Sequence, residues 1–419
     1  MSLTRQSRSL VSRKSRGLLF DWRADPLATN LDALTGQVAT YARAGSPNNA
    51  TAVDHLGRIY PAVTNQPRYV WTDDMPGLLL EGARTNLVIQ SDALTAANGW
   101  TLDAPAVVTA AYSTVGSLAL SRITGAATGH VRRAVTLTGD GTKAFSAVVQ
   151  FDGVAGTTRH ALYDTTVPAL RVEIIVTWSA DGTATAAAGA AGTLLFFEPL
   201  VAGSYRIIAA APSCVAANSH NVYAHLAGTA SSVRVGGVQV ENAVFPSSII
   251  PTTTTTLTRA ADSLSFAFAA APQAMTVYVD LVDFGSSALA TAGGAVFDIG
   301  SFSGTATTFI VYTGAGNYVI DVVGGAGEFT SVVTGATYGV RGEVRALLAA
   351  TGVAQIGMSV ADGAETLGSA TAVNALGATF RLPILYLNTY GGAGAIGYAA
   401  YRALRIAVGV KTMAEMRAM

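Results

Sequence analysis

Pairs of carboxylates are the residues in this sequence whose chemistry could break a glycosidic bond. Glycoside hydrolases hold two Asp or Glu side chains about 5–9 Å apart across the bond that they cleave. The candidates here are Asp280 with Asp283, Asp73 with Asp74, and the separate Glu241. No pattern of substrate-holding residues surrounds any of them, and solvated turns or sheet faces account for such acids equally well. We therefore expect a chain that is not an enzyme.

The histidines and the single cysteine lack the spacing that a metal site or a catalytic thiol needs. Of the five histidines, only His220 and His225 lie close in sequence, and an odd interval within one strand places their side chains on opposite faces. Cys214 stands among small apolar residues, which predicts a buried hydrophobe rather than a nucleophile with a histidine partner. We expect no metal, no cofactor and no internal disulfide.

Aromatic side chains could bind a sugar without converting it. Binding sites of this kind combine flat aromatic surfaces with a few polar groups that fix the orientation of the ligand. In a lectin-type sandwich, the candidates for solvent-side aromatics are Trp100, Trp178, Tyr312 and Tyr390. Aromatic residues also fill the core of every sandwich, and this second interpretation stays open for each of the four.

The first residues of the chain form a basic arm. Residues 1–16 hold five basic residues and no acid, which leaves 21 basic against 26 acidic residues in the rest of the chain. Such an arm can contact an acidic protein surface or a nucleic acid, and a solvated terminus is the alternative. We expect it to anchor the chain to partner proteins, not to nucleic acid. The residues assigned to anchoring are Arg5, Arg8, Arg13, Lys14, Arg16 and Trp22.

The composition indicates several domains with a weakly charged surface. A chain of 419 residues exceeds the size at which a single hydrophobic core stops growing. Only 12% of the residues are charged, so we expect other copies or partner proteins to cover part of the surface, in a homo-oligomer. The most apolar stretches are interrupted well short of the roughly 20 residues that span a membrane, so we expect no membrane insertion.

The elements that must position these residues are β-strands. From residue 77 onward, short apolar stretches alternate with Gly-bearing turns at intervals that suit a β-sandwich. In residues 145–151, Phe145, Ala147 and Val149 share one face of a strand, and Ser146 lies on the other. No helical period extends through residues 85–260, which argues against a parallel sheet with crossover helices.

The last third of the chain repeats this pattern. Val277, Val279 and Leu281 alternate with more polar neighbours, and a similar strand near residue 404 closes a second sandwich. Thr412 and Glu415 have the spacing of a capping box, which predicts one short helix at the end. The predicted fold is all-β: two tandem antiparallel β-sandwiches of jelly-roll type after a short irregular N-terminal anchor, with a short C-terminal helix.

The stretch between the two predicted sandwiches changes character along its length. It begins as a strand, in which Gly236 and Gly237 interrupt the alternation of valines, and this predicts a β-bulge. It continues through Pro251 and five successive threonines, which favour extended backbone. We therefore expect an extended connector over residues 251–262.

Two segments resemble a recurring frame in structural proteins of tailed bacteriophages, including tail fibres and other virion surface proteins. They are GLLLEGARTNLVIQSDAL, residues 77–94, and VRVGGVQVENAVFPSSIIPTTTTTLTRAADSL, residues 233–264. In that frame the first segment enters a jelly roll similar to a carbohydrate-binding module, and the second leads into a concanavalin A-like or laminin-G-like sandwich. The resemblance implies an anchor region over residues 1–76 and sandwiches over residues 77–250 and 263–419.

The resemblance also implies a function. We expect a non-enzymatic virion structural protein whose N-terminal part attaches to other virion proteins. Its sandwiches would be displayed on the virion surface, on the tail or the capsid exterior, as a tail fibre, tail tip, head fibre or decoration protein that attaches to host surface glycans. A fibre-like role implies a trimer. The alternatives are a glycan-cleaving tail spike enzyme and a secreted lectin-like adhesin.

Overall fold

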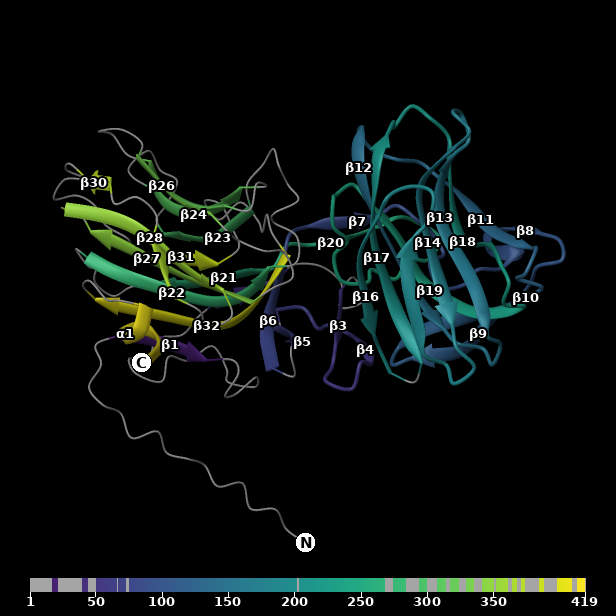
Figure 1. Cartoon of the computed structure of the whole chain (residues 1–419), viewed down its shortest axis with the longest axis horizontal. Helices are drawn as coiled ribbons and strands as arrows, with labels where there is room; N and C mark the ends of the chain where they lie inside the picture. Colours follow the sequence, from purple (N-terminus) through teal and green to yellow (C-terminus); the bar gives the residue numbers. More distant parts are fainter. Residues whose placement is uncertain are drawn as a thin grey trace, which may run out of the picture.

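The computed structural model describes most of the chain as antiparallel β-structure. The described residues are 17–21, 40–43, 50–65, 67–72, 75–201, 203–267, 274–283, 294–299, 307–313, 317–323, 329–334, 341–349, 352–360, 364–367, 371–373, 384–387, 398–408 and 413–418. They form two β-sandwiches that lie beside each other, with a short helix at the end of the chain (Figure 1). The prediction of an all-β fold with two sandwiches and a short C-terminal helix is confirmed.

The first sandwich consists of two six-stranded antiparallel sheets. The β12 sheet has the order β16 (Thr193–Pro199), β17 (Ser204–Cys214), β12 (Gly141–Gln150), β19 (Ser232–Glu241), β10 (Leu118–Thr124) and β9 (Val107–Val115). The β13 sheet has the order β15 (Ala184–Ala188), β14 (Ala169–Trp178), β13 (Gly156–Asp164), β18 (His220–Gly228), β11 (His130–Val135) and β8 (Thr101–Asp103). A 3-10 turn, Ala96–Asn98, lies just before β8.

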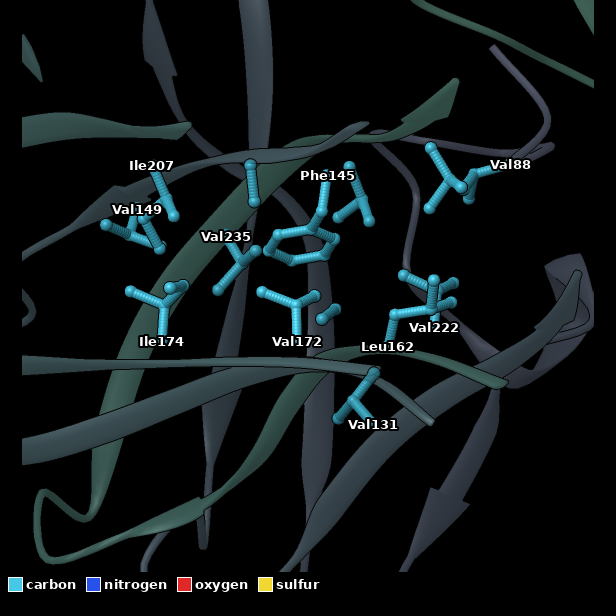
Figure 2. Packing of buried hydrophobic residues seen from close by; sticks show 14 of the residues in the cluster. Val88, Val131, Phe145, Val149, Leu162, Val172, Ile174, Ile207, Val222 and Val235 are labelled. Carbon is cyan, nitrogen blue, oxygen red and sulfur yellow. The ribbon is translucent and has the colours of Figure 1, made fainter. Parts of the chain in front are cut away.

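The core of the first sandwich lies between these sheets. Phe145 and Val149 from β12 point toward Val172 and Ile174 from β14, and all four side chains are fully buried (Figure 2). The predicted alternation along residues 145–151 is confirmed, because Val148 leaves the other side of the sheet and joins a separate cluster. Burying a side chain of this size contributes about 1.5–3 kcal/mol, so this interior is the main source of stability of the first sandwich.

The predicted bulge in β19 is also confirmed. The register of β12 with β19 shifts between Ser146 and Val148, opposite Gly236, and Gly237 has a φ of 57°. A side chain would be strained at that φ, whereas glycine adopts it freely. The bulge keeps the valines on both sides of it in the core, where Val235 and Val238 both pack.

The second sandwich consists of a nine-stranded and a seven-stranded sheet among the described residues. The path of the larger sheet is β29 (Thr366–Leu367), β28 (Gly352–Val360), β27 (Arg341–Ala349), β22 (Ala274–Asp283), β32 (Tyr398–Val408), β6 (Met75–Glu81) and β5 (Arg68–Thr72), with β1 (Gly17–Asp21) on β32 and β30 (Thr371–Val373) on β28. The order of the smaller sheet is β2 (Thr40–Ala42), β21 (Ser263–Ala267), β31 (Ile384–Leu387), β23 (Gly294–Ile299), β24 (Thr307–Thr313), β25 (Asn317–Val323) and β26 (Phe329–Thr334).

The N-terminal strands belong to this second sandwich, which corrects the expected organisation of the chain. We expected residues 1–76 to form a separate irregular anchor and the strand from residue 77 to open the first sandwich. Instead, β1 and β6 both pair with β32 near the C-terminus, β5 pairs with β6, and β2 pairs with β21. The physical reason is that the leucines of β6 need a buried partner sheet, and β32 supplies it from more than 300 residues away. The first sandwich is thus an insertion within the second.

One further N-terminal piece packs against the first sandwich. The hairpin of β3 (Thr51–Val53) and β4 (Ile59–Pro61) covers part of the outer face of the β12 sheet. Ile59 is buried there against Leu118, Leu120 and Val148. Backbone hydrogen bonds of 2.7 Å from Ser117 and 3.2 Å from Val201 fix the hairpin to this face. The N-terminal region therefore contacts both sandwiches.

The two segments that cross between the sandwiches are hydrogen-bonded to each other. Strand β7 (Arg84–Asn86) pairs with β20 (Leu257–Arg259) in a two-stranded sheet. Thr252 is buried and its hydroxyl donates to the carbonyl of Val88 at 2.6 Å. The predicted connector over residues 251–262 contains extended backbone at Leu257–Arg259, and this strand forms a ladder with the incoming segment.

A buried network of charges connects these crossings to β5. The Nη1 atom of Arg68 lies 2.5 Å from Oε2 of Glu81, and its Nη2 pairs with Asp262. The Nε atom of Arg259 lies 3.7 Å from Glu81, and its Nη1 lies 3.5 Å from Asp262. These four side chains are at most 1% exposed. Charges so deeply buried persist only when they are paired, so the network holds three distant segments in one arrangement.

Neutral partners complete the network. The backbone amide and the hydroxyl of Ser248 donate to Glu81 at 2.5 Å and 2.7 Å, and the hydroxyl of Tyr41 donates to Asp262 at 2.6 Å. Burial alone would raise the pKa of Glu81, but Arg259 and Arg68 outweigh it and lower this pKa to about 2. Glu81 is therefore ionised at neutral pH. Glu81 comes from residues 77–94, and Arg259 and Asp262 come from residues 233–264. These are the two segments whose resemblance to other proteins was noted in the sequence.

The C-terminal helix α1 (Met413–Ala418) packs on the larger sheet of the second sandwich. Met413 and Met416 bury themselves against Tyr278 of β22. The Nη1 atom of Arg405 in β32 donates to the carbonyls of Met416 and Arg417 at 2.5 Å and 2.6 Å. The last carbonyls of a helix lack intrahelical partners, so this arginine satisfies the helix end and attaches it to the sheet.

Candidate functional site

The outer face of the β13 sheet carries the candidate functional site. Successive side chains of a strand point to opposite sides of the sheet. Leu162 of β13 and Val222 of β18 point into the core, so Tyr163 and Tyr223 next to them point outward. The same alternation in β11 directs Val131 inward and His130 outward. Three rings from adjacent strands therefore gather on one face.

These three rings pack edge to face. The ring centroids of Tyr163 and Tyr223 are 6.4 Å apart with planes at 84°, and those of His130 and Tyr223 are 6.1 Å apart at 72°. This is a preferred geometry for aromatic pairs, and it fixes the orientation of the rings before any ligand binds. All three side chains are half-buried. The cluster, named here the tyrosine face, offers solvent an apolar surface with hydroxyl groups at its edge.

Polar residues with balanced charges flank the tyrosine face. Nε of Arg132, which lies opposite Tyr223 in the next strand, donates to Asp103 at 2.9 Å. The hydrogen bond from Arg132 is the main reason that the pKa of Asp103 lies below its ordinary value. Arg159 likewise pairs with Glu173 on β14. Each arginine has its own acid, so the face can donate and accept hydrogen bonds without a net charge.

Such a surface suits reversible binding of a polar, uncharged ligand. Burial raises the pKa of Tyr223 above its ordinary value, so its hydroxyl stays protonated at neutral pH. A sugar ring combines apolar C–H surfaces with hydroxyl groups, and both find counterparts here. The acids of the face, Asp103 and Glu173, are each held by an arginine.

Two of the four aromatics expected on the solvent side lie in the core instead. Trp100 is 2% exposed and donates its Nε1 to the carbonyl of Gln90 at 3.0 Å. Trp178 is 3% exposed and donates to the hydroxyl of Thr158 at 3.1 Å. The expectation of solvent-side rings is wrong for both, because Trp178 follows the inward alternation of β14 and Trp100 packs in the same cluster. Neither ring offers a face to a ligand.

The remaining predicted site residues lie outside what the structure describes. Tyr312 belongs to β24, whose backbone is described without its side chains, and Tyr390 lies outside the described residues. The basic arm of residues 1–16 and Trp22 also lie outside them. Their predicted roles in glycan binding and anchoring stay predictions.

The candidate carboxylates that are described are buried away from solvent. Glu241 is fully buried and accepts hydrogen bonds of 2.9–3.1 Å from Ser247. Burial raises the pKa of Glu241 above its ordinary value. Asp280 is fully buried in β22, whereas the side chain of Asp283 and the residues Asp73 and Asp74 lie outside what the structure describes. The described candidates thus present no pair of acids to a common space.

The histidines of the first sandwich are core residues. His220 and His225 pair with Val135 and Val131 of β11, and both of these valines point inward. The expectation of opposite faces is wrong, because the register shifts between Val131 and Arg132 and this irregularity resets the alternation. His225 is fully buried, and its Nε2 lies 2.6 Å from the carbonyl of Ala126.

Burial keeps the core histidines neutral and the cysteine protonated. His160 lies beside His225 with ring centroids 6.1 Å apart. Burial is the main reason that the pKa values fall to about 3 for His160 and about 4 for His225. Burial also raises the pKa of Cys214 to about 11, and the predicted buried position of this thiol is confirmed. Within the described ranges, no group of three or more His, Cys, Asp or Glu residues could hold a metal ion.

None of the helices in the described ranges has the length and apolar character needed to cross a bilayer.

The sequence interpretation missed the tyrosine face. Its signal is the alternation about Leu162 and Val222, two apolar residues with a tyrosine directly after each. Applied to both strands, the period of two would have directed Tyr163 and Tyr223 outward. Their adjacency, however, depends on the pairing of β13 with β18, which joins residues about 60 positions apart.

Comparisons with known proteins find similar architecture at low similarity. No protein-family model matches the chain, and no curated protein matches it. A Ruminococcus gnavus sialidase CBM40 bound to α2,3-sialyllactose is 12% identical, with a TM-score of 0.28, over 35% of this chain and 82% of that chain. The mouse laminin α1 domains LG4-5 are 10% identical, with a TM-score of 0.23, over 82% of this chain and 94% of that chain.

A phage protein is also among the similar solved structures. A tail fiber protein from an E. coli phage is 8% identical, with a TM-score of 0.22, over 78% of this chain and 41% of that chain. Identities and TM-scores this low assign the chain to no family.

Proposed function

We propose that the chain is a non-enzymatic structural protein of a bacteriophage virion that attaches to host surface glycans through its first sandwich. The observation that supports binding is the tyrosine face, in which Tyr163, Tyr223 and His130 form a preorganised aromatic surface flanked by paired charges. Rings held in place before binding lose little conformational freedom when a ligand arrives. The face is built for binding a neutral sugar.

The virion assignment is supported by the two phage-like segments and by what they do in this fold. They form the two crossings between the sandwiches, and their residues Glu81, Arg259 and Asp262 meet in the buried network. A rigid double crossing suits a protein that must display one domain at a fixed distance from its attachment point. The other sandwich, with its N-terminal strands, would face the particle on the tail or the capsid exterior.

The binding part of this proposal is tested with the intact protein on an array of bacterial surface glycans. We expect binding to neutral glycans that falls at least about tenfold in Tyr223→Ala, because the substitution removes the central ring of the cluster. The matched control is Tyr60→Ala, which removes an exposed tyrosine from the β3–β4 hairpin. Equal binding by both variants, or no binding by the unaltered protein, would contradict the role of the tyrosine face.

The non-enzymatic part is tested by incubating the protein with capsule or lipopolysaccharide and measuring reducing ends. We expect none to form, whereas their appearance would favour a glycan-cleaving spike. Antibody labelling of intact particles in electron micrographs tests the location on the virion. Mass measurement in solution tests the expected homo-oligomer, and a clean monomer would contradict it.

A further inference from the structure

A second cluster of solvent-facing residues lies on the opposite side of the first sandwich. It occupies the outer face of the β12 sheet, beside the area that the β3–β4 hairpin covers. Arg122 of β10 and Arg234 of β19 stand directly opposite each other in the antiparallel ladder. Their neighbours Ile123 and Val235 point into the core, so both guanidinium groups lie on the outer face.

One buried carboxylate serves both arginines. Nε of Arg122 donates to one oxygen of Asp152 at 2.6 Å, and Nε of Arg234 donates to the other at 2.7 Å. The side chain of Asp152 is 2% exposed, whereas those of Arg122 and Arg234 are 35% and 26% exposed. Although burial alone would raise it, the hydrogen bonds from Arg122 and Arg234 help to hold the pKa of Asp152 below its ordinary value. The cluster therefore carries two positive charges against one negative charge.

Some N–H groups of Arg122 and Arg234 are not used by these hydrogen bonds. Asp152 uses the Nε edge of each guanidinium, and Nη1 of Arg234 donates to the side chain of Gln150 at 3.0 Å. In the part of the chain that the structure describes, Arg122 donates no hydrogen bond from Nη1 or Nη2. Within that part, Arg234 donates none from Nη2. A guanidinium offers five N–H groups in a rigid fork, and a carboxylate accepts two of them in parallel. The free ends of the forks are thus available to an anion from solvent.

An exposed tyrosine completes the cluster. The guanidinium carbons of Arg122 and Arg234 lie 4.9 Å and 5.1 Å from the ring centroid of Tyr112, which is 46% exposed. The register of β9 with β10 shifts next to this tyrosine, and Ala111 has a φ of 49°. Residues other than glycine adopt this φ at a cost, so the backbone is locally strained next to the ring that lies over the arginines.

Neutralising Asp152 does not explain the pair of arginines. One arginine would be enough for one carboxylate, and like charges at directly opposed cross-strand positions destabilise a sheet. The tyrosine face shows the alternative arrangement, since Arg132 and Arg159 each have a separate acid there. A bound anion would remove the excess charge at Arg122 and Arg234.

We propose that Arg122, Arg234 and Tyr112 form a second binding site, for the carboxylate of an acidic sugar such as a uronic acid. The carboxylate accepts hydrogen bonds from the free guanidinium nitrogens, and the exposed side chain of Tyr112 contacts the sugar ring. The site is separate from the tyrosine face, which carries balanced charges. The chain thereby combines a site for neutral sugars with one for acidic sugars on opposite faces of one sandwich.

The test is a titration of the full-length protein with trigalacturonate, with the neutral galactose trisaccharide and inorganic sulfate as reference probes. We expect trigalacturonate to bind at least about tenfold more tightly than the other two, and to weaken with added salt. Equally tight binding of sulfate would replace the carboxylate site by a general anion site. Absence of trigalacturonate binding would overturn the proposal outright.

Variants assign the binding to these residues. Arg122→Gln removes the excess charge and should abolish trigalacturonate binding, whereas Arg58→Gln, which alters an exposed arginine paired with Asp54 in the β3–β4 turn, should leave it unchanged. Arg122→Lys keeps the charge without the fork and should weaken binding about tenfold. Tyr112→Ala leaves the ion pairs with Asp152 in place and should also weaken trigalacturonate binding. This variant tests the site if Arg122→Gln does not fold. Unchanged affinity in either Arg122→Lys or Tyr112→Ala would contradict the proposed geometry.

Discussion

The two sandwiches are assembled from the chain in opposite ways. The strands of the first sandwich, β8 to β19, follow one another in a single continuous stretch. The second sandwich takes β1, β2, β5 and β6 from before that stretch and its other strands from after it. Strand β32 pairs with β6 on one side and β22 on the other, so the larger sheet is complete only when both ends of the chain are present. The strands of the first sandwich are thus neighbours in sequence, whereas the second sandwich depends on distant segments.

Removing the N-terminal strands should therefore have the largest effect, and it should fall on the second sandwich. Deleting residues 1–72 removes β1, β2, β5 and Arg68 from the second sandwich, and only the β3–β4 hairpin from the outer face of the first. We expect the second sandwich to lose its protected amides in hydrogen exchange, because β32 loses a neighbouring strand and Glu81 and Asp262 lose a buried counter-charge. Protection in the core strands of the first sandwich should persist.

Deleting residues 1–16 is the matched control for this truncation, since it leaves every described strand in place. We expect it to leave exchange in both sandwiches unchanged. Full protection of β22 and β32 after deletion of residues 1–72 would show that the second sandwich closes without the N-terminal strands.

A single substitution in the buried network should reproduce part of this effect. Asp262→Ala leaves Arg68 and Arg259 buried near Glu81 alone, and we expect a loss of about 3–5 kcal/mol in the free energy of unfolding. Asp103→Ala breaks an ion pair that is 32–39% exposed and should cost no more than about 1 kcal/mol. Denaturant titrations measure both free energies of unfolding. Similar losses for the two variants would contradict a special role for the buried network.

A substitution in the core of the first sandwich should act on that sandwich alone. Phe145 is fully buried between the two sheets, and Phe145→Ala should cost about 3–5 kcal/mol from lost burial and the cavity that remains. Residue-level hydrogen exchange should show faster opening of β12 and β14 with β22 unaffected. Equal acceleration in β22 would mean that the two sandwiches unfold as one unit.

The pH dependence of stability should distinguish the first sandwich through its core histidines. The pKa values of His160 and His225 are about 3 and 4 in the folded chain, below the ordinary value near 6.5. Between these limits the unfolded chain binds more protons, so stability is present above pH 6.5 and is lost as the pH falls. Each histidine contributes a slope of about 1.4 kcal/mol per pH unit.

Asp92 acts in the opposite direction, since burial raises its pKa to about 6 and it takes up a proton in the folded chain. It therefore offsets about one histidine between pH 6 and its unfolded value near 4. Denaturant titrations from pH 7 to 4.5 measure the net slope. His160→Asn should reduce this slope by the contribution of one histidine. An unchanged slope would show that His160 is not neutral in the folded protein.

Local patterns predicted the strands well because their physical cause is local. The alternation of Phe145, Ala147 and Val149 fixed one face of β12, and the glycines at positions 236 and 237 located the bulge in β19. Both features follow from neighbouring residues on one strand. The same reasoning failed for His220 and His225, because the register shift that places them on one face arises in the pairing of two strands.

The candidate site was predicted less well, because burial depends on what covers a strand. Trp100 and Trp178 looked like solvent-side rings in the sequence, but the facing sheet encloses both. Arg122 and Arg234 lie more than 100 residues apart and share Asp152 only because β10 pairs with β19. No spacing along the chain indicates such a cluster.

The sequence by itself determined the all-β character, the two sandwiches, the bulge and the terminal helix, because the period of two, glycine positions and a capping pattern act within a few residues. The tertiary structure alone decided which sandwich each strand joins. Strand β6 carries three buried leucines that would suit either core, and only its hydrogen bonds to β32 and the pairing of Glu81 with Arg68 assign it to the second. Backbone hydrogen bonds and buried ion pairs depend on which groups lie close in space. Separation along the sequence does not determine them.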